Sequence, residues 1–87
     1  MNDIDLIKQI DLEDDNSILD ILDKVEEATI YNGKDGEGND IIVAIEPKSG
    51  IRVSTYQSNG WIRINDYDIA EDENRQYYII RSETYEK

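Results

Sequence analysis

Hydrophobic positions near the start of the chain repeat with the period of an α-helix. In residues 3–12, isoleucines three apart form one stripe with Leu6 beside them, and a second stripe follows at Ile18, Ile21, Leu22 and Val25. Spacing of this kind places apolar side chains on one face of a helix. Ser17 with Asp20 makes a capping box, which predicts that the second helix begins at Ser17. We therefore expect one or two helices within residues 1–27.

After residue 27 the pattern changes to the alternation of β-strands. Short apolar or alternating runs, bounded by turn residues, predict strands at residues 28–31, 40–45, 51–58, 61–67 and 76–82. Residues 32–39 contain three glycines and no aliphatic side chain, and predict a flexible hairpin loop. Pro47 suits a type I turn, with Gly50 as its left-handed residue. Residues 68–75 read as an acidic loop or helical turn, and residues 83–87 as a frayed tail.

Asn59-Gly60 is the strongest hairpin signal in the chain and predicts a two-residue loop. Such a loop pairs Ser58 with Trp61, Tyr56 with Arg63, Ser54 with Asn65 and Arg52 with Tyr67 on one side of the sheet. The other side receives Ile51, Val53, Thr55, Ile62 and Ile64, which we expect to face the core. The predicted fold is a single α+β domain, residues 1–87. One or two N-terminal helices (1–27) pack on one face of a four- or five-stranded antiparallel β-meander (28–82).

The residue types that the chain lacks exclude most catalytic mechanisms. It has no cysteine and no histidine, so it has no thiolate nucleophile, no thiolate zinc site and no imidazole base. Paired acids such as Asp66 and Asp68 could act as acid and base or hold magnesium. No phosphate-binding loop or nucleophile motif accompanies them. We expect a protein that is not an enzyme and needs no cofactor.

Negative charge is concentrated in the first half of the chain. The net charge is -12; residues 1–40 hold 13 acids and 3 bases (-10), and residues 41–87 hold 8 acids and 6 bases (-2). Such a surface repels nucleic acids and anionic membranes and attracts basic partners. The candidate acidic surface comprises chiefly Asp14, Asp15, Asp20, Asp23 and Glu27, with Glu71, Asp72 and Glu73 adding to it.

Two interpretations of this acidic surface remain open. Carboxylates on neighbouring helical turns lie about 5–6 Å apart, and phosphates of a nucleic-acid strand are spaced by several ångströms, so the surface could imitate a nucleic-acid backbone. The alternative is an ordinary solvated face, in which some acids only stabilise helix N-termini.

A second candidate surface is the outer face of the predicted sheet. It combines Arg52, Tyr56, Trp61, Arg63 and Tyr67, with Tyr77 and Arg81 as further candidates. Interleaved arginines and aromatic residues resemble a base-stacking platform, a set of cation–π pairs or a protein-binding hot spot. Because the rest of the molecule repels phosphate, we favour pairing or protein binding over direct contact with nucleic acid.

A calcium loop is a third alternative. Asp35, Glu37, Asn39, Ile42 and Glu46 fall at offsets 1, 3, 5, 8 and 12 of an EF-hand pattern. Asp40 occupies the offset at which the loop needs glycine, and Pro47 follows residues that read as strand. Both features oppose a calcium site.

The expected setting is cytoplasmic. The first residues lack the basic segment of a signal peptide, and no apolar run approaches the roughly 18 residues of a membrane span. We expect a basic protein surface as the partner, with a nucleic-acid-binding protein as one candidate, and no membrane association. The chain is expected to be a monomer or, through contact of acidic helix with arginine-bearing sheet, a weak homodimer.

Two resemblances add to this interpretation. Met1-Asn2, Asp5-Leu6-Ile7 and Ile10, with Asn59-Gly60-Trp61 before an acidic stretch, resemble the small acidic anti-CRISPR proteins of phages. That resemblance implies a DNA mimic that occupies the protospacer-adjacent-motif site of an effector nuclease. Residues 52–65 are similar to a segment of short proteins from conjugative and phage elements. Both imply a mobile-element accessory protein that acts as an inhibitor or as an adaptor.

Overall fold

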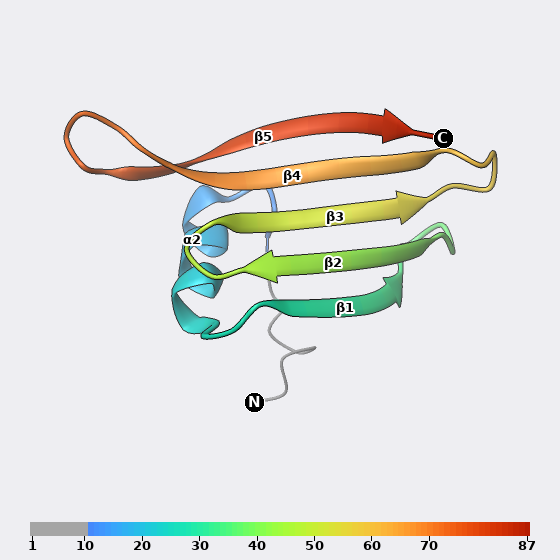
Figure 1. Ribbon diagram of the computed structural model, residues 1–87, viewed down its shortest axis with the longest axis horizontal. Helices are drawn as coiled ribbons and strands as arrows, with labels where there is room; N and C mark the ends of the chain where they lie inside the picture. Colours follow the sequence, from blue (N-terminus) through green and yellow to red (C-terminus); the bar gives the residue numbers. More distant parts are fainter. Residues whose placement is uncertain (1–10) are drawn as a thin grey trace.

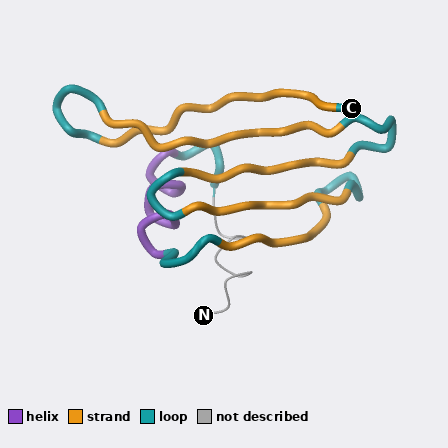
Figure 2. The backbone as a smooth tube through the Cα atoms, in the orientation of Figure 1, coloured by secondary structure: helices purple, strands orange, loops and turns teal. Residues whose placement is uncertain are grey.

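The computed structural model describes residues 11–87, which form an antiparallel sheet with a helix across one face (Figures 1 and 2). The five strands lie in chain order, so the sheet is a meander. The elements are α2 (Asp15–Lys24), β1 (Thr29–Lys34), β2 (Asp40–Glu46), β3 (Gly50–Tyr56), β4 (Ile62–Glu71) and β5 (Tyr77–Glu86). The predicted α+β class with an antiparallel sheet is confirmed. The helix predicted at residues 3–12 lies outside the described residues up to residue 10, and residues 11 and 12 are not helical.

Helix α2 begins two residues before the position predicted from Ser17. Asp14 is the N-cap: it is extended, and its side chain accepts a hydrogen bond from Asn16 N. The predicted capping box is therefore wrong, and Ser17 lies inside the helix, where its Oγ accepts from Asp11 N at 3.0 Å. The helix ends at Lys24, since Val25 is already extended, so residues 25–27 are not helical.

The core lies between α2 and one face of the sheet. Ile18, Ile21 and Leu22 are buried against a cluster from three strands, comprising Val43 and Ile45 of β2, Ile51 of β3 and Ile79 of β5, with partly buried neighbours. Full burial of one such side chain stabilises a fold by about 1.5–3 kcal/mol. The predicted stripe of α2 is thus the face that packs on the sheet.

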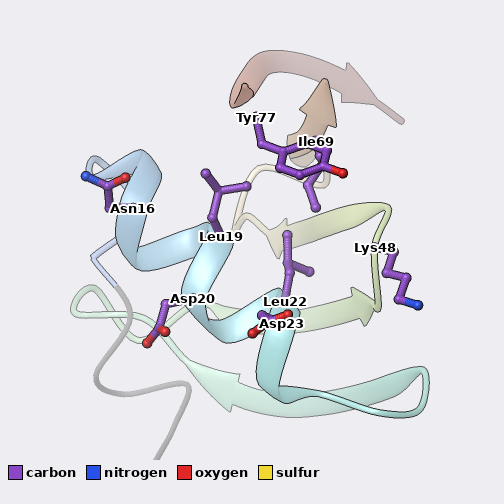
Figure 3. A pocket seen from close by; sticks show the side chains of 8 residues that line it. All are labelled: Asn16, Leu19, Asp20, Leu22, Asp23, Lys48, Ile69 and Tyr77. Carbon is purple, nitrogen blue, oxygen red and sulfur yellow. The ribbon is translucent and has the colours of Figure 1, made fainter. Parts of the chain in front are cut away.

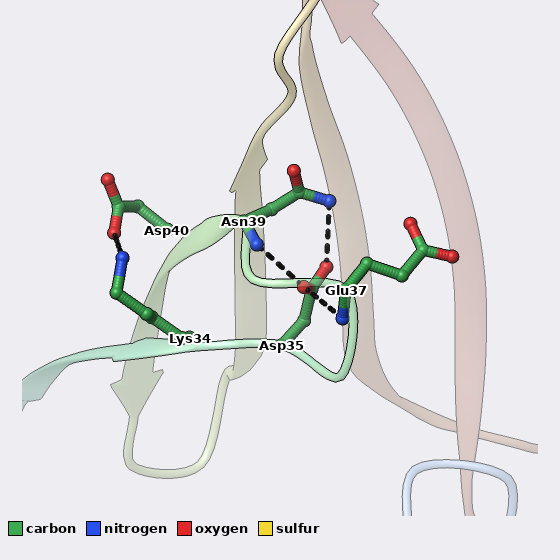
Figure 4. A network of polar contacts seen from close by, with 5 residues as sticks. All are labelled: Lys34, Asp35, Glu37, Asn39 and Asp40. Carbon is green, nitrogen blue, oxygen red and sulfur yellow. Dashed lines mark hydrogen bonds and ion pairs between the residues drawn. The ribbon is translucent and has the colours of Figure 1, made fainter.

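The first hairpin has a shorter loop than predicted. Strand β1 continues to Lys34, and the turn spans residues 35–39. Asp35 closes it: Oδ1 accepts from Glu37 N and Asn39 N, both at 2.9 Å, and Oδ2 accepts from Asn39 Nδ2 (Figure 4). The hydrogen bond from Asn39 N lowers the pKa of Asp35 below its ordinary value. The EF-hand alternative is not supported, because this carboxylate holds a β-turn and β2 follows it.

In the second hairpin, the residue with left-handed backbone is not the predicted one. Lys48, not Gly50, has a positive φ, of 65°, and Ser49 N donates to Glu46 O across the turn. Gly50 is needed for another reason: a Cβ there would lie 2.3 Å from the carbonyl oxygen of Tyr67 on β4. Close approach of two strands, and not turn geometry, selects this glycine.

The third hairpin has a register one residue away from the predicted one. Gln57 N donates to Trp61 O, Gly60 N donates to Gln57 O, and Gly60 has a φ of 90°, as in a type I turn followed by a bulge. Tyr56 therefore pairs with Ile62, and Arg52 with Asp66. Because side chains alternate along a strand, this shift moves every β4 side chain to the other face.

The last two strands are longer than predicted. Strand β4 continues to Glu71 and β5 starts at Tyr77, so the acidic loop is reduced to residues 72–76. Residues 83–86, predicted as a frayed tail, belong to β5 and pair with residues 62–65 of β4. The long ladder between β4 and β5 carries the hairpin tip beyond the rest of the sheet (Figure 1).

Candidate interaction surface

The segment around α2 carries most of the charge that the structure describes. Residues 11–27 contain eight acids and one base, a net charge of -7. Figure 1 places α2 and the β4–β5 turn, which contains Asp72 and Glu73, toward the same end of the molecule. The two predicted parts of the acidic surface therefore lie at one end.

Four of the eight predicted acids are bound to other groups of the protein. Asp14 caps α2, and Asp72 Oδ1 accepts from Asn74 N and Gln76 N in the β4–β5 turn. Asp20 forms an ion pair with Lys24 at 2.9 Å. Exposed i, i+4 pairs of this kind contribute only about 0.3–0.5 kcal/mol, so Lys24 holds Asp20 only weakly.

Asp15 joins α2 to the edge of the sheet. Its Oδ1 lies 2.6 Å from Nη1 of Arg81, and its Oδ2 accepts from Ile79 N on β5. The hydrogen bond from Arg81 lowers the pKa of Asp15 below its ordinary value. Arg81 also donates to the carbonyl oxygen of Leu12. This carboxylate therefore has a structural role and is less available to a partner.

The other four predicted acids remain open to solvent. Asp23, Glu27, Glu71 and Glu73 are exposed and have no ion pair or side-chain hydrogen bond with the rest of residues 11–87. Of the eight acids in residues 11–27, only Asp15 and Asp20 form an ion pair with a basic side chain of residues 11–87. The six acids without one, all exposed, are Asp11, Glu13, Asp14, Asp23, Glu26 and Glu27.

A groove lies between α2 and the sheet (Figure 3), and sequence reasoning did not identify it. It has a volume of about 640 Å³ and an apolar wall made by Leu19, Leu22, Ile69 and Tyr77. Polar side chains of α2 lie along one rim, and Lys48 of the β2–β3 turn lies on the other. The ring of Tyr77 is 61% exposed. Of the residues singled out from the sequence, Asp20 and Asp23 of the acidic surface and Tyr77 of the predicted outer sheet face line this groove.

The predicted arginine and aromatic face is divided between the two sides of the sheet. Arg52 and Tyr56 lie on the open side, where Arg52 forms a two-bond ion pair with Asp66, at 2.7 and 3.1 Å. Tyr67 and Arg63 lie on the helix side, because the β4 register is shifted. Burial raises the pKa of Tyr67 above its ordinary value. Ile62 and Ile64, predicted for the core, take their place on the open side.

Trp61 lies in the turn and not within a strand. Its ring is 39% exposed, and Lys87 Nζ lies 5.4 Å from the ring centroid, within the range of a cation–π contact. Tyr77 and Arg81, the further candidates, lie on the helix side of β5, with Ile79. The structure therefore brings together no continuous face of the predicted arginines and aromatic residues.

In residues 11–87 no three acidic side chains converge as ligands for a metal ion. Within the same range, no helix has the length and apolar character needed to cross a bilayer. Compared with known protein families, with curated proteins and with solved structures, the chain gives no significant match.

Proposed function

We propose that this protein binds a basic macromolecular surface through the acidic surface around α2 and has no catalytic role. The observation that carries the proposal is the set of six exposed acids in residues 11–27 that lack a basic partner among the described residues. Asp11 and Asp14 also accept hydrogen bonds from nearby backbone N–H groups, whereas Glu13, Asp23, Glu26 and Glu27 accept none from residues 11–87. Carboxylates that only supported the fold would be bound within it, as Asp15 and Asp72 are. Uncompensated charge of this kind raises association rates with cationic partners.

A DNA-mimic inhibitor is the specific form of this function that we put forward. Within α2, Asp20 and Asp23 lie one turn apart, a spacing of about 5–6 Å, and the tip of the β4–β5 hairpin adds Glu71 and Glu73 at the same end of the molecule. The partner is then a protein whose basic cleft normally holds nucleic acid. Binding of the protein and binding of DNA are mutually exclusive.

The test compares two variants that have equal charge. Asp23→Asn/Glu26→Gln/Glu27→Gln removes three acids from the acidic surface, and Glu37→Gln/Glu46→Gln/Glu86→Gln removes three from elsewhere, so each has a net charge of -9 (-12 plus 3). Each protein is immobilised and exposed to a bacterial lysate, and retained proteins are quantified by mass spectrometry. We expect basic nucleic-acid-binding proteins to be retained by wild type and the second variant and lost from the first.

Salt and DNA complete the test. Raising NaCl from about 0.1 to about 1 M shortens the Debye length from about 10 to about 3 Å and should release the partner. DNA added at low salt should release it too if the acidic surface imitates DNA. Equal retention by all three proteins, or retention unaffected by salt, would show that the acidic surface is not the binding surface.

As a second candidate function, the chain is an adaptor that binds a partner protein through the β3–β4 hairpin. Tyr56 and Trp61 favour it, because both rings are more than a third exposed beside this turn, and both residue types are common in interface hot spots. In this case Trp61→Ala abolishes retention of the partner, whereas the triple variant at Asp23, Glu26 and Glu27 retains it.

A further inference from the structure

We propose that the groove beside α2 receives an arginine side chain of the basic partner, with its guanidinium group against Tyr77 and the carboxylate of Asp23. This inference rests on the proposed function and adds the side chain that is recognised. The groove is concave, about 640 Å³ in volume. Sites of about 300–1,000 Å³ hold drug-sized ligands, so an arginine and the backbone that carries it would fit.

The groove offers an apolar wall and hydrogen-bond acceptors close together. Leu19 points toward Tyr77 and Ile69 (Figure 3), which together form a surface for an alkyl chain. Asn16, Asp20 and Asp23 follow at i, i+4 and i+7 on α2, so they share one face of the helix. Long basic side chains place their methylene groups on apolar surface and keep the charge at a polar rim.

Tyr77 favours arginine over lysine. Its ring is large and 61% exposed, and in residues 11–87 no cation lies over it, since the cation–π contact found there is at Trp61. A guanidinium group is planar, stacks on aromatic rings and donates two parallel hydrogen bonds to a carboxylate, whereas an ammonium group is compact and strongly hydrated.

Net charge argues against a second copy of this chain as the occupant, and Lys48 limits where a cation can enter the groove. Two copies would each bring a net charge of -12 to the contact. Lys48 is exposed, forms no ion pair with residues 11–87, and lies on the rim opposite Asn16 and Asp20. It repels cations at that side, so the α2 side of the groove takes the arginine.

The test is an NMR titration of the full-length, ¹⁵N-labelled protein with an oligo-arginine peptide and an oligo-lysine peptide of equal length. We expect amide shifts centred on residues 19–23 and Tyr77, with the arginine peptide bound roughly two- to five-fold more tightly, the range of an exposed cation–π contact. Tyr77→Ala should remove this preference, and Lys48→Gln should tighten binding of both peptides. Tyr85→Ala is the matched control, because Tyr85 is a similarly exposed ring on the same strand, 52% exposed, outside the groove.

The possible failures are distinguishable. Equal affinity for both peptides in wild type and Tyr77→Ala, with shifts spread over all exposed acids, would overturn the groove as an arginine site and leave the proposed function standing. No binding of either peptide at low salt would overturn both. Asp23→Asn gives a second test of the same contact. We expect it to weaken binding of the arginine peptide roughly 1.5- to fivefold, and unchanged affinity would contradict the proposed contact.

Discussion

Arg75 occupies a backbone position that two other turns give to glycine. The turns at residues 35–39, 57–61 and 72–76 have the same pair of backbone hydrogen bonds, and their fourth residues, Gly38, Gly60 and Arg75, have φ of 86°, 90° and 60°. Such left-handed backbone is unfavourable for a residue with a Cβ by about 1–2 kcal/mol. The β4–β5 turn therefore holds a strained residue where its counterparts do not.

Arg75→Gly should stabilise the protein. Relief of the left-handed strain contributes about 1–2 kcal/mol, and the greater freedom of glycine in the unfolded chain offsets about 0.5–1 kcal/mol of it. We expect the free energy of unfolding, measured by urea denaturation, to rise by about 0.5–1 kcal/mol. Gly60→Ala is the control at the equivalent position. A Cβ there would meet no neighbouring atom, so this substitution should lower stability only through the unfavourable positive φ. If both variants lost stability, the strain argument would be wrong.

At the scale of elements, the presence of each strand could be predicted from the sequence, but the register in which β3 and β4 pair could not. Asn-Gly suits both a two-residue hairpin loop and the three-residue loop with a bulge, and only the second occurs at Gly60. The apolar pattern of β4 could not decide between them, because Ile62 and Ile64 lie on one face and Ile69 on the other. Arg63 and Tyr67 were therefore assigned to the wrong face, while α2 and the antiparallel order followed from spacing and turn residues.

The contact of α2 with β5 should depend on pH. The hydrogen bond from Arg81 lowers the pKa of Asp15 in the folded protein, so its stabilising effect is present above the unfolded-state pKa of about 3.9 and is lost as pH falls through the folded value. Asp15→Asn keeps an acceptor for Ile79 N and removes the charge. We expect this variant to be less stable than wild type at neutral pH, with the difference shrinking below about pH 4, as measured by urea denaturation across pH.

A double-mutant cycle isolates the ion pair at this junction. In an Arg81→Gln background, the effect of Asp15→Asn on stability should vary less with pH. The largest cause of the lowered pKa of Asp15 is then absent, and only the hydrogen bond from Ile79 N still lowers it. A difference that keeps its full pH dependence without Arg81 would assign the effect to another charge. The comparison is needed because the chain has many other carboxylates, with 21 aspartates and glutamates in all.

At the scale of the whole molecule, the sequence located the acidic surface but not the groove within it. Charge is additive along a chain, so the concentration of acids before residue 41 was visible without coordinates. The groove depends on α2 lying beside Ile69 and Tyr77, which are about fifty residues away in sequence. Such a juxtaposition follows from tertiary packing, so Asp20, Asp23 and Tyr77 could each be singled out in the sequence but not placed beside one another.

Unbalanced charge should make this protein more stable in salt. The molecule measures 43 × 31 × 20 Å, so at about 0.01 M salt, where the Debye length is about 30 Å, most of its charges interact. Two of the four ion pairs in residues 11–87, Lys24–Asp20 and Lys34–Asp40, are highly exposed and contribute little. The Arg52–Asp66 and Arg81–Asp15 pairs are less exposed but balance only two of the acids, so repulsion within a net charge of -12 dominates. We expect the Tm at pH 7 to rise between about 0.01 and about 0.1 M NaCl, by about 4–8 °C for each kcal/mol of repulsion relieved.

The control is the same measurement near the isoelectric point of about 4.1, where the net charge is close to zero and added salt should leave the Tm almost unchanged. An equal rise at both pH values would mean that salt acts through hydration and not through screening.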